Sequence, residues 1–359
     1  MLRRSGFSDK WPVVPLSEVV TFLDNLRKPV KASERVEGDY AYYGANGLQG
    51  SIDGYLFDES LVLLAEDGGH FGNPDRDIAY IATGKYWVNN HAHVLKPKDN
   101  IDLTFLYRVL QRYDVTPFIK GATRAKLTKG DASRIPVPLP PLPEQKRIAA
   151  ILDKADQLRQ KRQQAIGLAD EFLRSVFLDM FGDPVTNPKG WEVKPLKSLV
   201  NVMSGGTPSK KNETYWSGEF PWVSPKDMKS VEISDALDHI SDSVFTETNL
   251  KKVPTSSILI VVRGMILAHT VPVAITTRDV AINQDMKAFT CTDYLLPNFL
   301  LWFLKSQHEH LLSKVSSAAH GTKRFEMDDL LSLPVFLPSL ELQKHFSEIT
   351  QKFKSFSAV

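Results

Sequence analysis

The chain has 359 residues, which exceeds one typical core and suits two domains. A composition of 42% hydrophobic and 24% charged residues excludes extensive disorder. The formal net charge of +2 decides nothing about a nucleic-acid ligand, whereas the single cysteine, Cys291, excludes an intramolecular disulfide and a cysteine-based zinc site. Because no apolar signal segment follows the basic start and no run suits a membrane span, we expect a soluble, cytoplasmic protein.

One pattern of residues occurs twice along the chain. It opens at Trp11 and again at Trp191, each time with a valine two positions on and then a Pro-Leu pair. Each copy continues with an apolar run bounded by turn formers, at 60–65 and at 257–262. Such runs are typical of buried strands, so the sequence predicts an internal duplication of two α/β modules.

Each copy then has a helix, a basic loop and a proline-rich segment. The apolar spacing over 103–110 predicts an amphipathic helix, and 296–315 is its counterpart. Gly-containing basic loops follow at 121–124 and 321–324. The prolines at alternate positions after each loop exclude a helix or a central strand, which leaves an edge strand or a polyproline-like segment.

A long helix is predicted after the first proline-rich segment. It begins at Pro143, where proline costs no hydrogen bond, and ends before Gly182. A heptad pattern of apolar residues runs along it, and a second heptad pattern ends the chain. The first set is Ile148, Ile151, Ala155, Leu158, Ala165, Ala169, Phe172 and Val176; the second is Leu342, Phe346, Ile349, Phe353 and Phe356. We expect the two helices to pair antiparallel; the alternative is two unrelated helices, each packing on its own domain.

Residues 138–153, Pro-Leu-Pro-Pro-Leu-Pro-Glu-Gln-Lys-Arg-Ile-Ala-Ala-Ile-Leu-Asp, resemble the central conserved region of the specificity subunits of type I restriction-modification systems. After Trp191, the segments 204–209 and 221–224 are similar to the start of a target recognition domain of that family. The first copy shows the same likeness at 42–47, and 89–93 is similar to 282–286. The resemblance covers about residues 11 to 356 and occurs twice in the same order.

The resemblance implies an α/β (α+β) fold with a pseudo-two-fold repeat, in which two tandem target recognition domains are separated by long helices that form an antiparallel coiled coil. The implied parts are a first target recognition domain at 1–142, a central conserved spacer helix at 143–182, a second target recognition domain at 183–338 and a shortened C-terminal spacer helix at 339–359. The last helix is shorter than the family pattern, which puts symmetric docking of two partner subunits in doubt.

The function implied by the resemblance is non-catalytic. The chain would read a bipartite, asymmetric target on double-stranded DNA and direct methyltransferase (modification) subunits and a restriction (translocase-nuclease) subunit to it. S-adenosylmethionine, ATP and Mg²⁺ are then expected in the partner subunits, and no cofactor, metal or catalytic residue in this chain. A rigid helix between two readers would fix the spacing of the half-sites, which we expect to be about one DNA turn.

Sequence reading requires polar groups at base edges and cations at phosphates. A small hydroxyl and lysine loop in the second copy, basic loops in both copies and three amides fit these roles. The candidates are Thr207, Ser209, Lys210 and Lys211; Arg124, Lys126, Lys323 and Arg324; and Asn90, Asn283 and Gln284. The competing interpretations are a solvated turn, ordinary surface charge and amides that satisfy buried backbone.

Two alternatives to DNA reading are retained. A restriction nuclease, or a nuclease-methyltransferase accessory, is suggested by Asp183 with Glu192 and Lys194, whose spacing resembles a nuclease metal site. A repeat-built protein scaffold is the other. The histidine pairs 91/93 and 308/310 could face one metal, but structural roles are favoured. No phosphate-binding loop or methyltransferase motif is present.

Overall fold

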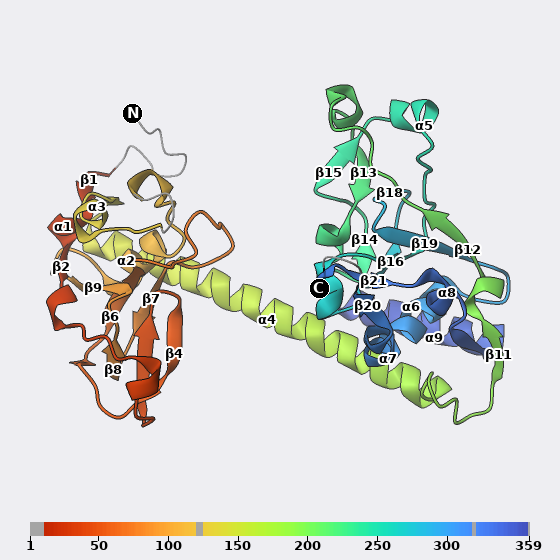
Figure 1. Ribbon diagram of the computed structural model, residues 1–359, viewed down its shortest axis with the longest axis horizontal. Coiled ribbons are helices and arrows are strands. Elements are labelled where there is room, and N and C mark those ends of the chain that lie inside the picture. The colour runs from red at the N-terminus through yellow and green to blue at the C-terminus, as the bar shows by residue number, and fades with distance from the viewer. Residues whose placement is uncertain (1–10, 120–124, 318–320, 358–359) are drawn as a thin grey trace. The chain divides into compact units, whose positions relative to one another are not determined.

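The computed structural model describes residues 11–119, 125–317 and 321–357, with side chains described as far as Phe353. The chain forms two compact units, Met1–Gln163 and Gln164–Val359, and the helix α4 (Leu142–Phe181) contributes to both (Figure 1). The two-domain expectation is therefore confirmed. Within the described residues, no helix is both long enough and apolar enough to cross a membrane.

The first unit is built on two four-stranded sheets. One has the order β2-β9-β6-β7 and the other β4-β3-β8-β5, and only β3 and β8 pair in parallel. The strands are β2 (Val20–Phe22), β3 (Tyr40–Gly44), β4 (Gly47–Ile52), β5 (Phe57–Asp58), β6 (Leu61–Ala65), β7 (Ala79–Ala82), β8 (Lys85–Val88) and β9 (Ala92–Pro97). Helix α2 (Leu103–Leu110) packs on β6 and β7 and closes the core. Short helical turns connect them: α1 (Leu16–Val19), α3 (Lys129–Ala132), η1 (Asp24–Leu26), η2 (Ala32–Glu34) and η3 (Thr116–Phe118).

The second unit repeats this plan. A five-stranded sheet has the order β12-β19-β16-β17-β14, and a three-stranded sheet has the order β15-β13-β18. The strands are β12 (Val200–Ser204), β13 (Phe220–Val223), β14 (Glu232–Ile233), β15 (Asp238–Ile240), β16 (Ile258–Val261), β17 (Val273–Thr276), β18 (Ala281–Ile282) and β19 (Met286–Cys291), with a hairpin of β20 (Val315–Ser317) and β21 (Lys323–Phe325). The helical segments are α5 (Ser243–Glu247), α6 (Pro297–Ser306), α7 (His308–Ser313), α8 (Met327–Leu331), η4 (Leu196–Ser198), η5 (Glu213–Trp216), η6 (Pro225–Asp227) and η7 (Met265–Ala268).

The central strands of the two units correspond residue by residue. In the first unit Leu64 lies opposite His93 across β6 and β9, and in the second Ile260 lies opposite Lys287 across β16 and β19. The predicted buried strands at 60–65 and 257–262 are confirmed, because β6 and β16 are fully buried. The single helix expected over 296–315 is corrected to α6 and α7, since the chain leaves helical geometry at Gln307.

The proline-rich segments are edge strands, the first of the two alternatives that the prolines left open. β10 (Pro136–Pro138) pairs antiparallel with β1 (Val13–Pro15), and β22 (Pro334–Leu337) pairs with β11 (Glu192–Pro195). Each ladder has only two strands, so a proline without an N–H is tolerated. The start of each copy is thereby tied to its end, which defines each repeat as one closed unit.

In each unit, a buried glutamine fixes the helix that follows the proline-rich strand. Gln145, in the first turns of α4, accepts from Asp102 N (2.8 Å) and donates to Asn100 O (3.0 Å) and Pro140 O (2.8 Å). Gln343, in α9 (Leu340–Ser357), makes the same three bonds to Leu296 N, Tyr294 O and Pro338 O. Both side chains are fully buried, so each locks a helix start to the strand and helix before it.

As far as its side chains are described, helix α9 pairs antiparallel with the C-terminal end of α4. Phe172 stacks on Phe353 with ring centroids 4.9 Å apart, and Phe346 contacts Phe177 and Phe181, each at 5.5 Å. Val176, Leu342 and Phe353 also border the core of the second unit. At the other end of α4, Ile148 borders the core of the first unit.

The predicted heptad seam does not extend along the whole of α4. Ile151 and Leu158 are 54% and 60% exposed, Ala155 and Ala165 are exposed, and Ala169 is half-buried. The buried face near the end of α4 is Leu173, Phe177 and Phe181, at every fourth position, because this segment packs on a domain core rather than along a supercoiled partner. On α9, Ile349 is half-buried, whereas the Phe356 side chain lies outside the described residues.

Candidate nucleic-acid interface

The second unit gathers polar side chains at one end of β16 and β19. The residues are those of the loop 205–209, the turn 283–285, the segment 263–265 and β21; we call this set the second edge. Gly206 N donates to Ile282 O (2.9 Å), and the Thr207 hydroxyl donates to the Gln284 side-chain oxygen. A Cβ on Gly205 would lie 2.0 Å from Asn283 O, so only glycine permits this approach of the loop to the turn.

Main-chain hydrogen bonds connect the turn 283–285, through the segment 263–265, to the hairpin of β20 and β21. Asp285 O accepts from Val262 N (2.8 Å) and Arg263 N (3.2 Å), and Gly264 N donates to Lys323 O (2.9 Å). Arg263 and Arg324 also form an isolated β-bridge. The structure therefore brings together Thr207, Gln284, Lys323 and Arg324, which the sequence predicts as DNA contacts but places in three separate segments.

The cations of β21, and Lys210 and Lys211 directly after the loop 205–209, differ in how far they are already paired. Arg324 bonds Glu326 at 2.6 Å, and Lys323 Nζ donates to Ser317 Oγ at 2.8 Å. Lys210 and Lys211 are exposed and, across the described residues, form no ion pair. Pairs this exposed are weak, so all four side chains remain available to an anionic ligand.

The first unit has an equivalent set of residues, the turn 89–91, Glu66, Asp67 and Lys126, which we call the first edge. Main-chain hydrogen bonds define the correspondence. Asn89 N donates to Tyr43 O (3.0 Å) as Asn283 N donates to Val223 O (2.9 Å). Each asparagine then accepts from the backbone two residues on, at His91 N (2.8 Å) and Asp285 N (3.0 Å). Asn283 is only 6% exposed, and its side chain is bonded within the turn. The prediction that it contacts a base is therefore replaced by a structural role. The exposed amides are Asn90 and its true counterpart Gln284.

The two basic loops align differently in the structure than in the sequence. The sequence pairs 121–124 with 321–324, and the structure shifts this alignment by two residues. Leu127 N donates to Glu66 O (2.7 Å) as Phe325 N donates to Val262 O (2.8 Å), which makes Lys126 the counterpart of Arg324. The bridge of Asp67 with Lys126 matches that of Arg263 with Arg324. Arg124 lies outside the described residues.

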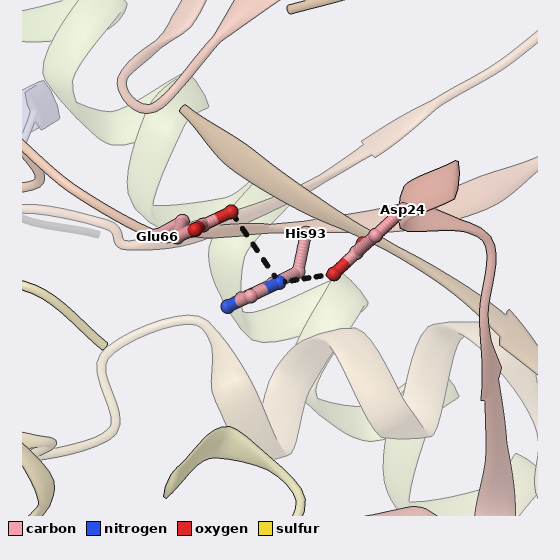
Figure 2. Close-up of side chains that lie close together, drawn as sticks. All are labelled: Asp24, Glu66 and His93. Atoms are coloured by element: carbon pink, nitrogen blue, oxygen red, sulfur yellow. Dashed lines mark hydrogen bonds and ion pairs between the residues drawn. The ribbon is translucent and has the colours of Figure 1, made fainter. Parts of the chain in front are cut away.

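Beneath the first edge lies a buried cluster of Asp24, Glu66 and His93, brought from η1, the end of β6 and β9 (Figure 2). Asp24 Oδ2 lies 2.7 Å and Glu66 Oε2 3.7 Å from His93 Nδ1, while Nε2 of the same ring lies 2.8 Å from Leu127 O. The His93 ring is thereby held between the Asp24 carboxylate on one side and a main-chain carbonyl on the other. It is 1% exposed.

Two carboxylates and an imidazole form a donor set that metals favour, but cations of the chain already occupy this one. Arg27 Nη1 bonds Glu66 Oε2 and Ala92 O, each at 2.6 Å, and Lys126 Nζ lies 3.0 Å from Glu66 Oε1. The donors do not fit a metal ion, and the cluster is an ion-pair network that anchors Lys126. The structural role favoured for the histidine pair 91/93 agrees with this, since His91 pairs with Asp67.

The charges in the cluster shift its carboxyl groups. Burial raises the pKa of Asp24. Hydrogen bonds from His93 and Val94 N and the charge of Arg27 lower it by more, so the pKa lies below its usual value. Burial likewise raises the pKa of Glu66, and bonds from Arg27 and Lys126 outweigh it, again giving a lowered pKa. Both carboxylates are therefore ionised at neutral pH.

The nuclease alternative finds no support. Lys194 pairs with Glu192 at 3.2 Å, Glu192 is 67% exposed, and Asp183 accepts from Val185 N and Thr186 N in a local turn. Among the described residues, the cluster beneath the first edge is the only group of metal-ligating side chains, and these three are not in it. His308 accepts from Val271 N (3.3 Å), which is a structural role.

Comparisons with known proteins identify the family of this chain. The model of the type I restriction modification DNA specificity domain matches residues 8–167 and 188–358, once over each copy. The chain belongs to this family, so it is a DNA-specificity component of a type I system and not a catalytic subunit.

Individual relatives agree with that assignment. A Haemophilus influenzae chain named as a type I restriction enzyme specificity subunit is 30% identical over 358 residues, which is 96% of this chain and 87% of the relative. An Escherichia coli type I restriction enzyme specificity subunit is 29% identical over 62% of this chain and 56% of its own length. The crystal structure of the S subunit of the type I system from M. genitalium has the same fold, with a TM-score of 0.61 at 15% identity, covering 99% of this chain and 92% of that one.

Proposed function

We propose that this chain reads a bipartite, asymmetric DNA target, with one half-site read by each unit. The observation that carries the proposal is the pair of edges: the same main-chain bonds hold Asn89 and Asn283 in both units, yet the exposed positions beside them carry different side chains. Equivalent frameworks with unequal polar groups are what two readers of different sequences require. Cations at both edges would contact phosphates.

The helix α4 acts as the spacer between the two readers. It has 40 residues without a break, a length of roughly 60 Å at about 1.5 Å per residue. A rigid element of this kind would hold the half-sites at a constant spacing, which we place at about one DNA turn.

Methyltransferase and restriction subunits are the proposed protein partners, and S-adenosylmethionine, ATP and Mg²⁺ would be bound by those partners. The exposed apolar side chains on α4 support docking of a protein there: Leu158, Ile166 and Leu168 are 60%, 52% and 66% exposed. With genomic DNA as its ligand, the complex would act in the cytoplasm.

The experiment that tests this proposal is mapping of methylated bases in cells that carry the complete system, with and without this chain. One heptad is inserted after Gln163, within the exposed stretch 157–168. It adds about 10 Å, so the spacer of the methylated site should lengthen by about three base pairs while both half-sites stay unchanged.

A matched control replaces one exposed heptad of α4 with a different polar sequence of the same length. It should leave the spacer as it is. A spacer of unchanged length after the insertion would contradict the proposal. Methylation that persists at the same site without the chain would also contradict it.

A further inference from the structure

The second edge holds one arginine that the sequence did not nominate. Arg263 follows β16 directly, its side chain is exposed, and among the described residues no carboxylate, carbonyl or ring accepts from or stacks on its guanidinium. Its neighbour across the β-bridge, Arg324, is by contrast paired with Glu326 at 2.6 Å. An exposed guanidinium without a partner is the group at this edge most available to a ligand.

The main chain on both sides of Arg263 is held firmly. Arg263 N donates to Asp285 O (3.2 Å), Gly264 N donates to Lys323 O (2.9 Å), and Gly264 adopts a φ of 133° that side-chain-bearing residues rarely reach. The guanidinium therefore extends from an anchored position. Such anchoring lowers the ordering cost of making a specific contact.

The neighbours of Arg263 fit the floor of a DNA groove better than the phosphate backbone. Gln284, beside Asp285, offers an exposed amide, and Thr207 offers a hydroxyl bonded to it. Met265 is 64% exposed two residues after Arg263. An apolar side chain gains little beside a phosphate, whereas base edges in the major groove present both polar groups and thymine methyls.

We propose that Arg263 determines specificity by donating two hydrogen bonds to O6 and N7 of a guanine in the half-site read by the second unit. The planar fork of a guanidinium matches these two acceptors, and no other base offers both in the major groove. The proposal rests on the proposed function, because it assigns one base contact within the same DNA-reading edge.

The first unit cannot use this contact. The residue equivalent to Arg263 is Asp67, because both form the bridge to the basic loop, and Asp67 pairs with His91. A carboxylate is repelled by the acceptors of guanine. Loss of Arg263 should therefore affect only the half-site of the second unit.

The test measures binding of the methyltransferase complex that contains this chain to duplexes carrying its mapped target. Each guanine of the second half-site is replaced in turn by 7-deazaguanine, which keeps Watson–Crick pairing and removes the N7 acceptor. For the wild type, one replacement should weaken binding about ten-fold. Arg263→Ala should lose a similar factor on the normal target and show no further loss with that replacement.

Two more variants separate the fork from charge and folding. Arg263→Lys keeps the charge and can still donate to guanine, but without the planar fork, so it should bind the target more weakly than the wild type and more tightly than Arg263→Ala. Arg278→Ala is the matched control, because Arg278 is an exposed arginine just after β17. The end of β17 bonds Ser257, at the opposite end of β16 from Arg263, so this variant should bind like the wild type. Thermal unfolding of each complex checks that all variants fold.

The proposal is overturned if no guanine of the second half-site is sensitive in the wild type, or if the sensitivity survives in Arg263→Ala. Equal weakening on target and unrelated duplexes would also overturn it, since that is the signature of a phosphate contact. A wild-type complex with no preferred sequence would instead refute the proposed function itself.

Discussion

The edges of the two units share a backbone and differ in chemistry. In the first, Asp67 pairs with His91 above the buried Asp24–His93 cluster. In the second, the equivalent residues are Arg263 and Asp285, and Lys287 takes the place of His93 and bonds Ser204 Oγ at 2.7 Å. The duplication therefore retained the hydrogen bonds that shape the edge while the side chains that would meet a ligand diverged.

What has been retained lies mainly in the buried polar groups. Asn89 and Asn283 make the same turn, and Gln145 and Gln343 make the same three helix-anchoring bonds. A buried amide that loses one bond leaves an unsatisfied group, so such positions tolerate little change. Exposed positions such as Asn90 and Gln284 carry no such constraint.

The largest effect is expected from removing the buried histidine of the first unit. His93→Leu leaves the Asp24 carboxylate without its 2.7 Å partner and should lower the free energy of unfolding of that unit by about 3 kcal/mol. Lys287→Leu, at the matched position of the second unit, should cost less than about 1 kcal/mol because its contact is exposed. Denaturant unfolding followed by hydrogen exchange resolves the two units; equal costs would show that the cluster is not the distinguishing feature.

A smaller and symmetric effect is expected at the glutamines. Gln145→Leu and Gln343→Leu each leave a buried N–H and two carbonyls without partners, and each should destabilise its own unit by about 2 kcal/mol. Hydrogen exchange of the segments around 100–102 and 294–296 reports the loss locally. A large cost in one unit and none in the other would break the equivalence of the two anchors.

The smallest difference is expected from acid. The lowered pKa values of Asp24 and Glu66 stabilise the first unit at any pH above the unfolded-state values of about 4, and this contribution is lost as the pH falls through the folded-state values. Between neutral pH and about pH 3, the first unit should therefore lose more stability than the second. Hydrogen exchange corrected for intrinsic rates measures this, with His93→Leu expected to reduce the difference; a second unit that opens first would contradict the assignment.

The sequence by itself determined the duplication, the strands β6 and β16 and the long helix α4, and it restricted the proline segments to an edge strand or a polyproline-like conformation. These features follow from local rules: apolar runs, prolines that lack an N–H, and a heptad-like pattern that Gly167 alone interrupts. It also carried the family likeness, through the residues around the first proline-rich segment. Local rules did not predict which heptad residues of α4 are buried. Their burial depends on the length of the partner helix, and α9 has only 18 residues.

Only the tertiary structure decided which polar residues form the edges. Asn283 and Gln284 are adjacent amides, yet one is buried in a turn and the other is exposed, a difference set by the approach of Gly205 and Val223. Arg263 was missed because it follows a buried strand without a basic neighbour, and its place beside Arg324 arises from a bridge between distant segments. The Asp24–Glu66–His93 cluster likewise joins three separate elements. Pairings over such separations depend on sheet register, which single-residue patterns do not specify.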